Sequence, residues 1–471
     1  MVMGDLPEQT DLVVVGGGPG GYAAAFRAAD LGMDVTVVSD EPRLGGVCLL
    51  RGCIPSKALL HVAEVLNLAE EAEQMGVAFG EPKVDLDAVR GWKDGVVDHL
   101  VSGLESIAER RGVRIVKGRA RFDSPRRVHV RDVGFLEFQQ AIVATGSRPT
   151  PLPGTEFGGR IMSSDGALDL PDVPERLLVV GGGYIGLEMG SVYAALGSRV
   201  TLVEMLDRLM PNADGDLVEP LAQRVGERFA GVHLDTKVTE VRQSEDGVEV
   251  AFDGSDAPDE TTFERLLIAV GRQPNADTLG LENTGVDLDD DGFVLVDERR
   301  RTADERIYAI GDVAGGMLLA HEAMHEGVVA AEAIAGEPSA YDVRAVPAVV
   351  YTDPAVAWCG LSEQQAQAEG RDVQVTRFPW RASGRALTMN ATEGFTKLVV
   401  EPQSQRVLGW GMVGRHAEAM IAEGVLSVEM AAVARDLALT MHPHPTLSET
   451  VQEVAQTLAQ GATTHLPPGG G

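Results

Sequence analysis

Two of the three cysteines in this 471-residue chain, Cys48 and Cys53, lie only five positions apart. On a straight helix that spacing is a rise of about 7.5 Å, beyond the roughly 4.4–6.8 Å between the Cα atoms of a disulfide. The backbone therefore has to bend between them, and the surrounding glycines suit a distorted turn. We expect a helix to begin near Pro55, since proline favours the first helical turn. The pair predicts a redox-active disulfide that is easily reduced.

Other uses of these cysteines fit the sequence less well. A zinc site needs four ligands, and no second cluster of cysteine or histidine completes one, so we expect no metal. The third cysteine, Cys359, is expected to be a small buried hydrophobic residue. Two unrelated buried thiols at Cys48 and Cys53 remain an open alternative, although the glycines and the proline around them would then have no purpose.

The overall charge limits the partners. With 71 acidic residues against 40 basic ones, the net charge of -31 argues against nucleic acids and anionic membranes. Only six of the basic residues are lysines, and an acidic, lysine-poor surface favours a salt-rich cytoplasm. We see no apolar run long enough to span a bilayer and no signal peptide, so a cytoplasmic location is expected.

A glycine-rich turn follows the first predicted strand, residues 11–15. The strand, a G-x-G-x-x-G turn and an alanine-rich helix that reaches Leu31 together form the opening of a dinucleotide-binding fold. The acid expected after the second strand, at 34–38, is absent or displaced, because Ser39 precedes Asp40. The glycines of this turn are Gly16, Gly18 and Gly21.

The same pattern occurs again at residues 177–204. Its acid, Glu204, directly follows the strand 199–203, so this unit should prefer NAD(H): a carboxylate accepts from the ribose 2′-hydroxyl and repels a 2′-phosphate. Two such units in one chain indicate one cofactor that stays bound and one that exchanges. The stretch that begins at Gly271 closes this insertion. The glycines of the second turn are Gly181, Gly183 and Gly186.

Two further strand ends could contribute to a cofactor site. Thr145 and Gly146 follow a buried strand, and Gly311 and Asp312 follow another, where the carboxylate could accept from ribityl or ribose hydroxyls. From about residue 344 the chain changes to alternating strands and later helices, which suggests an α+β interface or capping domain.

A histidine pair stands near the C-terminus. His444 has Glu449 five residues later, and the two could be an acid/base and the carboxylate that orients it. Spacing alone supports this weakly. For His442 we expect an ordinary surface histidine at a proline-rich turn.

Taken together, these motifs resemble the flavin-dependent pyridine nucleotide-disulfide oxidoreductases, over nearly the whole chain to about residue 460. The resemblance implies an α/β protein with two Rossmann-like domains and a C-terminal α+β dimerisation domain. It places an FAD domain at 1–149 and 276–344, an NAD domain at 150–275 and the dimerisation domain at 345–462, with a disordered tail at 463–471.

The resemblance also implies roles for individual residues. Cys48 resembles the thiol that meets the substrate and Cys53 the thiol that contacts the flavin, while Tyr184 takes the place of the nicotinamide-site lid. Lys57 and Glu188 resemble the ion pair beside the flavin, and His444 with Glu449 the dyad that serves the partner subunit of a homodimer. FAD is assigned to Gly16, Gly18, Gly21, Asp40, Lys57, Thr145, Gly146, Gly311 and Asp312, and NAD to Gly181, Gly183, Gly186, Glu204 and Gly271.

The activity implied is oxidation of a dithiol, favoured as the lipoyl group of a 2-oxoacid dehydrogenase or glycine-cleavage system, with electrons passing through FAD to NAD⁺. Three departures from the family pattern bear on the substrate: Leu50, Ser39 and Pro443. Two alternatives remain. One is an NAD(P)H-dependent reductase of a small disulfide of the glutathione or γ-glutamylcysteine type. The other is a non-catalytic flavoprotein component of a multienzyme complex.

Overall fold

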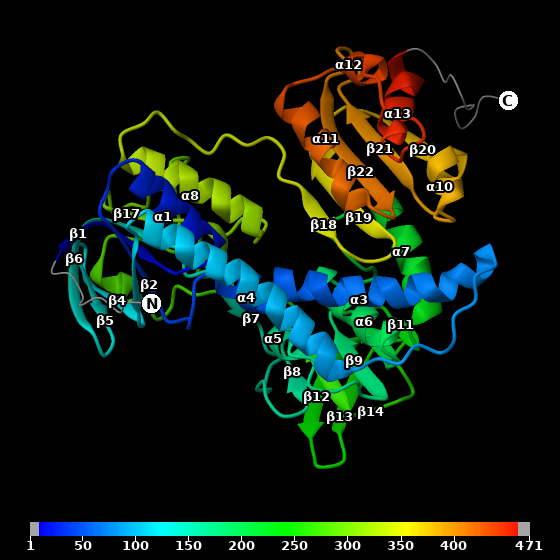
Figure 1. The fold of residues 1–471 in the computed structure, drawn as a ribbon, viewed down its shortest axis with the longest axis horizontal. Coiled ribbons are helices and arrows are strands. Elements are labelled where there is room, and N and C mark those ends of the chain that lie inside the picture. Colours follow the sequence, from blue (N-terminus) through cyan, green and yellow to red (C-terminus); the bar gives the residue numbers. More distant parts are fainter. Residues whose placement is uncertain (1–8, 460–471) are drawn as a thin grey trace.

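The computed structural model describes residues 9–459, so the predicted tail at 463–471 lies outside the described part of the chain. Three sheets organise these residues: two mainly parallel sheets and a C-terminal antiparallel sheet. Figure 1 shows the three parts, with the long helix α3 (Cys53–Glu71) running between the second sheet and the C-terminal sheet. The predicted class, two Rossmann-like units followed by an α+β domain, is confirmed.

The first unit combines the N-terminal part of the chain with one strand from much further along. Its sheet has the order β3-β2-β1-β6-β5-β4, and β17 pairs in parallel with β6. The unit contains β1 (Gln9–Val15), α1 (Pro19–Asp30), β2 (Val35–Ser39), α4 (Leu86–Arg110), β3 (Arg114–Lys117), β4 (Ala120–Ser124), β5 (Arg127–Val130), β6 (Gly134–Val143), β17 (Ile307–Ala309) and α8 (Ala320–Ile334). The second half of the central strand β1, Leu12–Val15, is a continuous, buried apolar run because both of its faces are covered.

The second unit repeats this arrangement. Its sheet has the order β11-β10-β9-β15-β8, with β9 and β10 in the places of β1 and β2. It contains β8 (Ile161–Met162), α5 (Ser164–Leu168), β9 (Arg176–Val180), α6 (Tyr184–Ala195), β10 (Arg199–Val203), α7 (Gly215–Arg228), β11 (Gly231–His233) and β15 (Arg265–Ile268). A small antiparallel sheet is inserted before β15: β12 (Lys237–Gln243), β13 (Val248–Asp253) and β14 (Thr262–Phe263).

The chain enters and leaves the second unit through one two-stranded ribbon. Strand β7 (Ser147–Pro149) pairs antiparallel with β16 (Arg272–Pro274). The Thr145 hydroxyl donates to the Asn275 carbonyl (2.9 Å), and the Asn275 side-chain amide donates back to the Thr145 carbonyl (3.0 Å). The two crossings are therefore held together beside the first unit.

The C-terminal domain is an antiparallel sheet of order β18-β19-β22-β21-β20, with helices packed on it. It contains β18 (Ala348–Val350), β19 (Ala355–Gly360), α9 (Glu363–Ala368), β20 (Gln374–Pro379), α10 (Gly384–Thr388), β21 (Phe395–Val400), β22 (Val407–Gly414), α11 (Ala417–Glu429), α12 (Ala434–Leu439) and α13 (Glu449–Ala459). Cys359 lies in β19 and is 1% exposed, as expected of a buried hydrophobic residue.

A short helix α2 (Gly46–Arg51) precedes α3, and the 3-10 helix η1 (Ala72–Met75) follows it; by length and composition alone, the stretch Gly46–Met75 is apolar enough to cross a membrane. The expectation of no uninterrupted apolar run stands, because Arg51, Lys57 and several glutamates lie within this stretch. Within residues 9–459 this stretch is broken at Gly52 and contacts both α4 and α6, and Leu59 belongs to the same apolar core as the second unit. Its apolar character follows from this central position in the fold.

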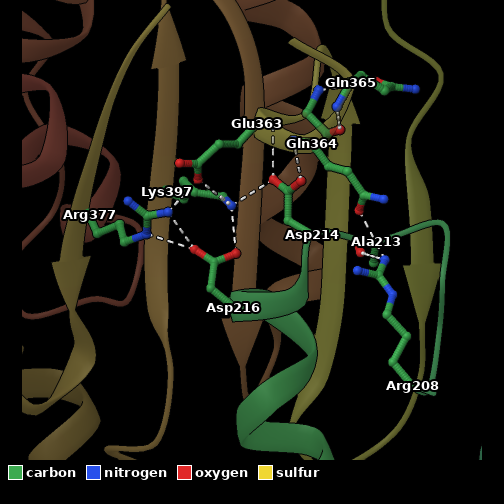
Figure 2. A network of polar contacts seen from close by, with 10 residues as sticks. Arg208, Ala213, Asp214, Asp216, Glu363, Gln364, Gln365, Arg377 and Lys397 are labelled. Carbon is green, nitrogen blue, oxygen red and sulfur yellow. Dashed lines mark hydrogen bonds and ion pairs between the residues drawn. The ribbon is translucent and has the colours of Figure 1, made fainter. Parts of the chain in front are cut away.

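A buried ion cluster joins the second unit to the C-terminal domain (Figure 2). Lys397 on β21 is 1% exposed, and its Nζ lies 2.6 Å from carboxylate oxygens of both Asp214 and Asp216 at the start of α7. Glu363 on α9 and Arg377 on β20 complete the cluster. Burial opposes ionisation of Asp214, but the hydrogen bond from Lys397 lowers its pKa. The Lys397 ammonium group occupies the space among these three carboxylates where a metal ion would bind. We therefore interpret the cluster as a set of ion pairs that joins the two domains.

Candidate active site

The two cysteines lie on either side of a break between helices. Cys48 is in the middle of α2, and Cys53 is the first residue of α3. Gly52 makes the break: its backbone is at φ -140° and ψ -112°, and a Cβ there would lie 2.8 Å from the Val47 carbonyl oxygen. The expected bend is confirmed, but α3 begins at Cys53, two residues before Pro55, because the bend is complete at Gly52.

The thiols of Cys48 and Cys53 are both free in this structure. Their surroundings shift the pKa values of the two thiols in opposite directions. The Cys48 thiol donates a hydrogen bond to the Cys53 sulfur, which is the main cause that lowers the pKa of Cys53; the charge of Lys57 lowers it further. The same hydrogen bond, followed by burial, raises the pKa of Cys48. The position of Cys53 at a helix N-terminus also favours a thiolate. The arrangement therefore favours the thiolate at Cys53 over a thiolate at Cys48.

A buried ion pair lies one helical turn beyond Cys53. Lys57 Nζ is 2.9 and 3.0 Å from the two carboxylate oxygens of Glu188 on α6, whose side chain is 3% exposed. Glu188 also accepts from the Ser56 hydroxyl (2.9 Å) and the Tyr351 backbone N–H (3.0 Å). The Tyr351 ring lies below the ammonium group, 4.4 Å from Nζ to the ring centroid. Every oxygen of the carboxylate is thus occupied, which fixes Lys57 beside the cysteines.

These groups open into one cavity of about 540 Å³. It extends from the first glycine turn to the cysteine pair and to the face of α6 that carries Tyr184 and Glu188. Of the residues predicted to hold FAD, Gly21 alone does not line it; a Cβ there would lie 2.0 Å from the Gly16 carbonyl oxygen, so its place is in packing. The other predicted FAD residues all line the cavity: Gly16, Gly18, Asp40, Lys57, Thr145, Gly146, Gly311 and Asp312.

The far wall of the cavity is held by a second buried carboxyl group. Glu326 on α8 accepts from the Gly311 backbone N–H at 2.5 Å and pairs with Arg300 at 3.0 Å. Burial raises the pKa of Glu326 to about 7. Asp312 accepts from the Ser147 hydroxyl, to which Arg272 also donates (2.7 Å). The Gly311–Asp312 turn is therefore fixed from two sides.

The glycines of the second turn lie outside this cavity, as do Glu204 and Gly271, although Tyr184 and Ile185 of the same turn line it. The Glu204 carboxylate accepts from the Gly182 backbone N–H (2.6 Å) and from the Leu206 N–H (2.8 Å). The acid thus lies directly against the turn, and its contact with a ribose stays a prediction.

The histidine dyad forms, but away from the cysteines of its own chain. His444 Nδ1 is 2.8 Å from Glu449 Oε1, and the His444 side chain is 81% exposed. Burial opposes ionisation of Glu449, but the Thr446 N–H and the nearby imidazole of His444 lower its pKa. Neither dyad residue lines the cavity. The other histidine, His442, corrects our expectation: its side chain is 5% exposed and paired with Glu423 at 2.8 Å.

Several site residues went unnoticed in the sequence: Ser56, Ser147, Arg272, Arg300, Glu326 and Tyr351. One signal was available, since Cys53 with Lys57 and Tyr184 with Glu188 are each four residues apart and so share a helix face. The contacts of Ser56, Ser147 and Tyr351 join segments more than a hundred residues apart, and Arg300 pairs with Glu326 across 26 residues, so none of them leaves a local pattern.

Comparison with known proteins places the chain. A family model described as "Pyridine nucleotide-disulphide oxidoreductase" matches residues 10–327, and the dimerisation domain of that family matches residues 346–455. A dihydrolipoyl dehydrogenase of Vibrio cholerae is 44% identical over 98% of this chain and 97% of its own length. Dihydrolipoyl dehydrogenase 2 of Haloarcula marismortui is 46% identical over 99% of this chain and 100% of its own.

The solved structures agree with this fold. LpdA from Mycobacterium tuberculosis superimposes with a TM-score of 0.87 at 28% identity, covering 95% of this chain and 99% of its own. The HOCl-induced flavoprotein disulfide reductase RclA from Escherichia coli gives 0.84 at 27% identity, covering 95% and 99%. The chain belongs to the pyridine nucleotide-disulphide oxidoreductases, and carries both their nucleotide-binding region and their dimerisation domain.

Proposed function

We propose that this protein is a dihydrolipoyl dehydrogenase, which oxidises dihydrolipoamide to lipoamide and reduces NAD⁺. The observation that carries the proposal is the histidine dyad. An exposed His444 oriented by Glu449 adds a proton acceptor for a thiol substrate to the cysteine pair, in a chain 44–46% identical to enzymes of that name. The cofactors are FAD and NAD.

The residues of the first cavity fit FAD. The close approach of the Gly16 turn to the neighbouring strand leaves room for a pyrophosphate, and the Asp312 carboxylate is fixed where it can accept from hydroxyl groups. When bound there, FAD supplies the two-electron transfer between the cysteine pair and NAD⁺. We propose domain limits of 1–149 with 276–344 for FAD, 150–275 for NAD and 345–462 for dimerisation.

The side chains of the protein transfer protons and carry out thiol–disulfide exchange. His444 Nδ1 faces Glu449, which leaves Nε2 to take a proton from the substrate dithiol. The substrate thiolate attacks Cys48 Sγ in the oxidised pair, and the Cys48–Cys53 bond breaks. Cys53 leaves as a thiolate, stabilised by Lys57 and by its place at the start of α3. The second substrate thiol then attacks the mixed disulfide, which releases Cys48 and the cyclic disulfide product.

The dyad requires a second subunit in this proposal. His444 and Glu449 do not line the cavity that contains Cys48 of the same chain, and they lie in the dimerisation domain. We infer a homodimer in which each His444 serves the cysteine pair of the partner. A cytoplasmic location and service to a 2-oxoacid dehydrogenase complex are further parts of the proposal.

The test is the rate of NAD⁺ reduction by dihydrolipoamide with FAD-loaded protein in molar salt. We expect rapid turnover, and a fall of roughly 100-fold or more in His444→Gln, because general acid–base catalysis contributes about 10²–10⁴-fold. Replacement of the paired histidine outside the dyad, His416→Gln, serves as the control and should keep full activity. If the wild-type enzyme contains flavin but does not oxidise dihydrolipoamide, the proposed substrate is wrong.

A second candidate follows from the likeness to RclA, which is described as a flavoprotein disulfide reductase. An NAD(P)H-dependent reductase of a small disulfide would use the same cysteine pair in the reverse direction. Leu50, half-buried between the two cysteines, is the residue whose change most favours a different substrate. Disulfide-dependent oxidation of NADH or NADPH that exceeds dihydrolipoamide turnover would support this candidate.

A further inference from the structure

The loop that carries His444 is tied to the protein by a second imidazole–carboxylate pair. His442 Nε2 is 2.8 Å from Glu423 Oε1, on helix α11, and its Nδ1 is 3.1 Å from the Thr440 carbonyl oxygen, at the end of α12. The His442 side chain is 5% exposed, whereas that of His444, two residues later, is 81% exposed. The imidazole of His442 is therefore buried against the protein, and that of His444 is exposed to solvent.

Both neighbours of the His442 ring accept hydrogen bonds. A carboxylate and a backbone carbonyl offer no proton, so a ring nitrogen is the donor in each hydrogen bond it makes with them. The bond to the Glu423 carboxylate, at 2.8 Å, is charge-assisted and is among the stronger contacts a loop can have. The ring also acts on Glu449 of α13, whose pKa His442 helps to lower.

The rest of the loop is held by the buried side chain of Leu447 and by local hydrogen bonds. The Thr446 hydroxyl donates to the Pro443 carbonyl (2.8 Å), and the Thr446 N–H donates to Glu449 (2.8 Å). These contacts stay within the loop or reach α13. Among the described residues, His442 supplies the side-chain contact from this loop to α11, so it sets where the start of the loop lies.

We propose that His442 and Glu423 are positioning residues, which hold the loop so that the outward imidazole of His444 has a fixed location and direction. The pair contacts neither the cysteines nor the cavity, and it acts through His444. This inference rests on the proposed function, in which His444 must reach a thiol on another subunit. An error of about 1 Å in such a group can cost as much as 100-fold in rate.

The experiment replaces Glu423, since its side chain is 31% exposed and its loss leaves little buried space. In the FAD-loaded enzyme, Glu423→Ala should lower kcat for dihydrolipoamide about ten-fold, with the KM for NAD⁺ unchanged. Glu423→Gln keeps an oxygen that accepts from Nε2–H and should restore most of the activity. NADH oxidation by a one-electron dye, which bypasses the cysteines and His444, should be the same in all forms.

A matched control removes another carboxylate of the same helix. Glu418 faces His416 at 3.5 Å, and Glu418→Ala should leave both activities unchanged. Equal kcat values in Glu423→Ala and wild type would overturn the inference. So would a parallel loss of dihydrolipoamide and dye activity, because that would show a general structural role.

Hydrogen–deuterium exchange of residues 440–448 gives an answer that needs no substrate. Exchange should be faster in Glu423→Ala and close to wild type in Glu423→Gln and Glu418→Ala. Unchanged exchange in Glu423→Ala would refute the positioning role. Suppose that exchange is faster in Glu423→Ala but that the wild-type enzyme does not oxidise dihydrolipoamide. The positioning role would then be supported, and only the proposed substrate would be wrong.

Discussion

The two glycine turns of this protein have the same backbone and different surroundings. Gly16 and Gly181 have φ of +115° and +113°, and a Cβ would lie 2.1 and 2.3 Å from the carbonyl oxygen of the neighbouring strand. The strand that follows the first turn ends in Ser39, which is buried, whereas Glu204 stands at that place in the second and binds its own turn. Both turns bring a glycine close to the backbone of the neighbouring strand. They differ in the residues that surround the turn.

The two nucleotide sites differ in the segments that lie over their glycine turns. The Gly45 N–H donates to the Gly17 carbonyl (2.9 Å), and a Cβ on Gly46 would lie 2.5 Å from the Gly18 Cα, so the cysteine-bearing segment closes over the first turn. The second turn is covered at the corresponding place by the segment that carries Met210, whose N–H donates to the Gly182 carbonyl (3.1 Å), and Glu204 binds this turn as well. A cofactor on the first turn would be enclosed beside the cysteines, and one on the second could exchange. The difference teaches that the two sites are distinguished by what the covering segment carries, since the segment over the first turn brings Cys48 and Cys53 to the cavity.

The largest expected effect is from alanine at the two equivalent glycines. Gly16→Ala should abolish FAD binding and with it all activity, because the new Cβ meets backbone that cannot move aside. Gly181→Ala should keep FAD and reduction of the flavin by dihydrolipoamide, yet lose NAD⁺ reduction by roughly 100-fold or more, a change of about 2.7 kcal/mol. Flavin absorbance per protein and rapid-mixing reduction measure both. Loss of flavin from Gly181→Ala would break the comparison.

The next effect concerns the pair that joins the two units, Lys57 and Glu188. Lys57→Met leaves Glu188 buried without a counter-charge and should lower turnover roughly 30- to 100-fold. Because the Lys57 charge lowers the pKa of Cys53, its removal should raise that pKa and move thiolate reactivity to higher pH. Alkylation of the reduced enzyme against pH measures the shift. The exposed Lys237→Met is the control; an unshifted profile in Lys57→Met would contradict this electrostatic role.

A smaller effect is expected at the acid of the second turn. Glu204→Ala should raise the KM for NAD⁺ about ten-fold and lower that for NADP⁺, since the variant loses a hydrogen-bond acceptor and a charge that repels a 2′-phosphate. Steady-state kinetics with both nucleotides test this. Unchanged selectivity would mean that the carboxylate serves only the backbone of its own turn.

The smallest effect is expected at the equivalent position of the first turn. Ser39→Ala removes only a 3.3 Å contact from the Glu41 N–H to the serine hydroxyl, so FAD affinity should change less than about three-fold. Equilibrium dialysis of the apoenzyme measures it. A large loss would show that the first turn depends on its strand-end residue as much as the second does.

Much of the fold could be predicted because its pieces are local. A buried apolar run before a glycine turn specifies strand, turn and helix within some twenty residues, and the observed elements agree closely, as in β10 at Arg199–Val203. The bend between Cys48 and Cys53 also followed from spacing and glycine. The helix expected near Pro55 begins at Cys53, so that the proline lies in its first turn.

The sequence by itself determined the two nucleotide turns, the cysteine pair and the spacing of the dyad, because steric limits on glycine and the reach of neighbouring side chains act over a few residues. Only the tertiary structure decided that α3 faces α6 and so joins Lys57 to Glu188, that His442 is buried on Glu423, and that Lys397 lies among three acids. Helical periodicity tells which face is apolar, but not which distant segment covers it. Those contacts depend on how the sheets and helices pack, and no short pattern encodes that.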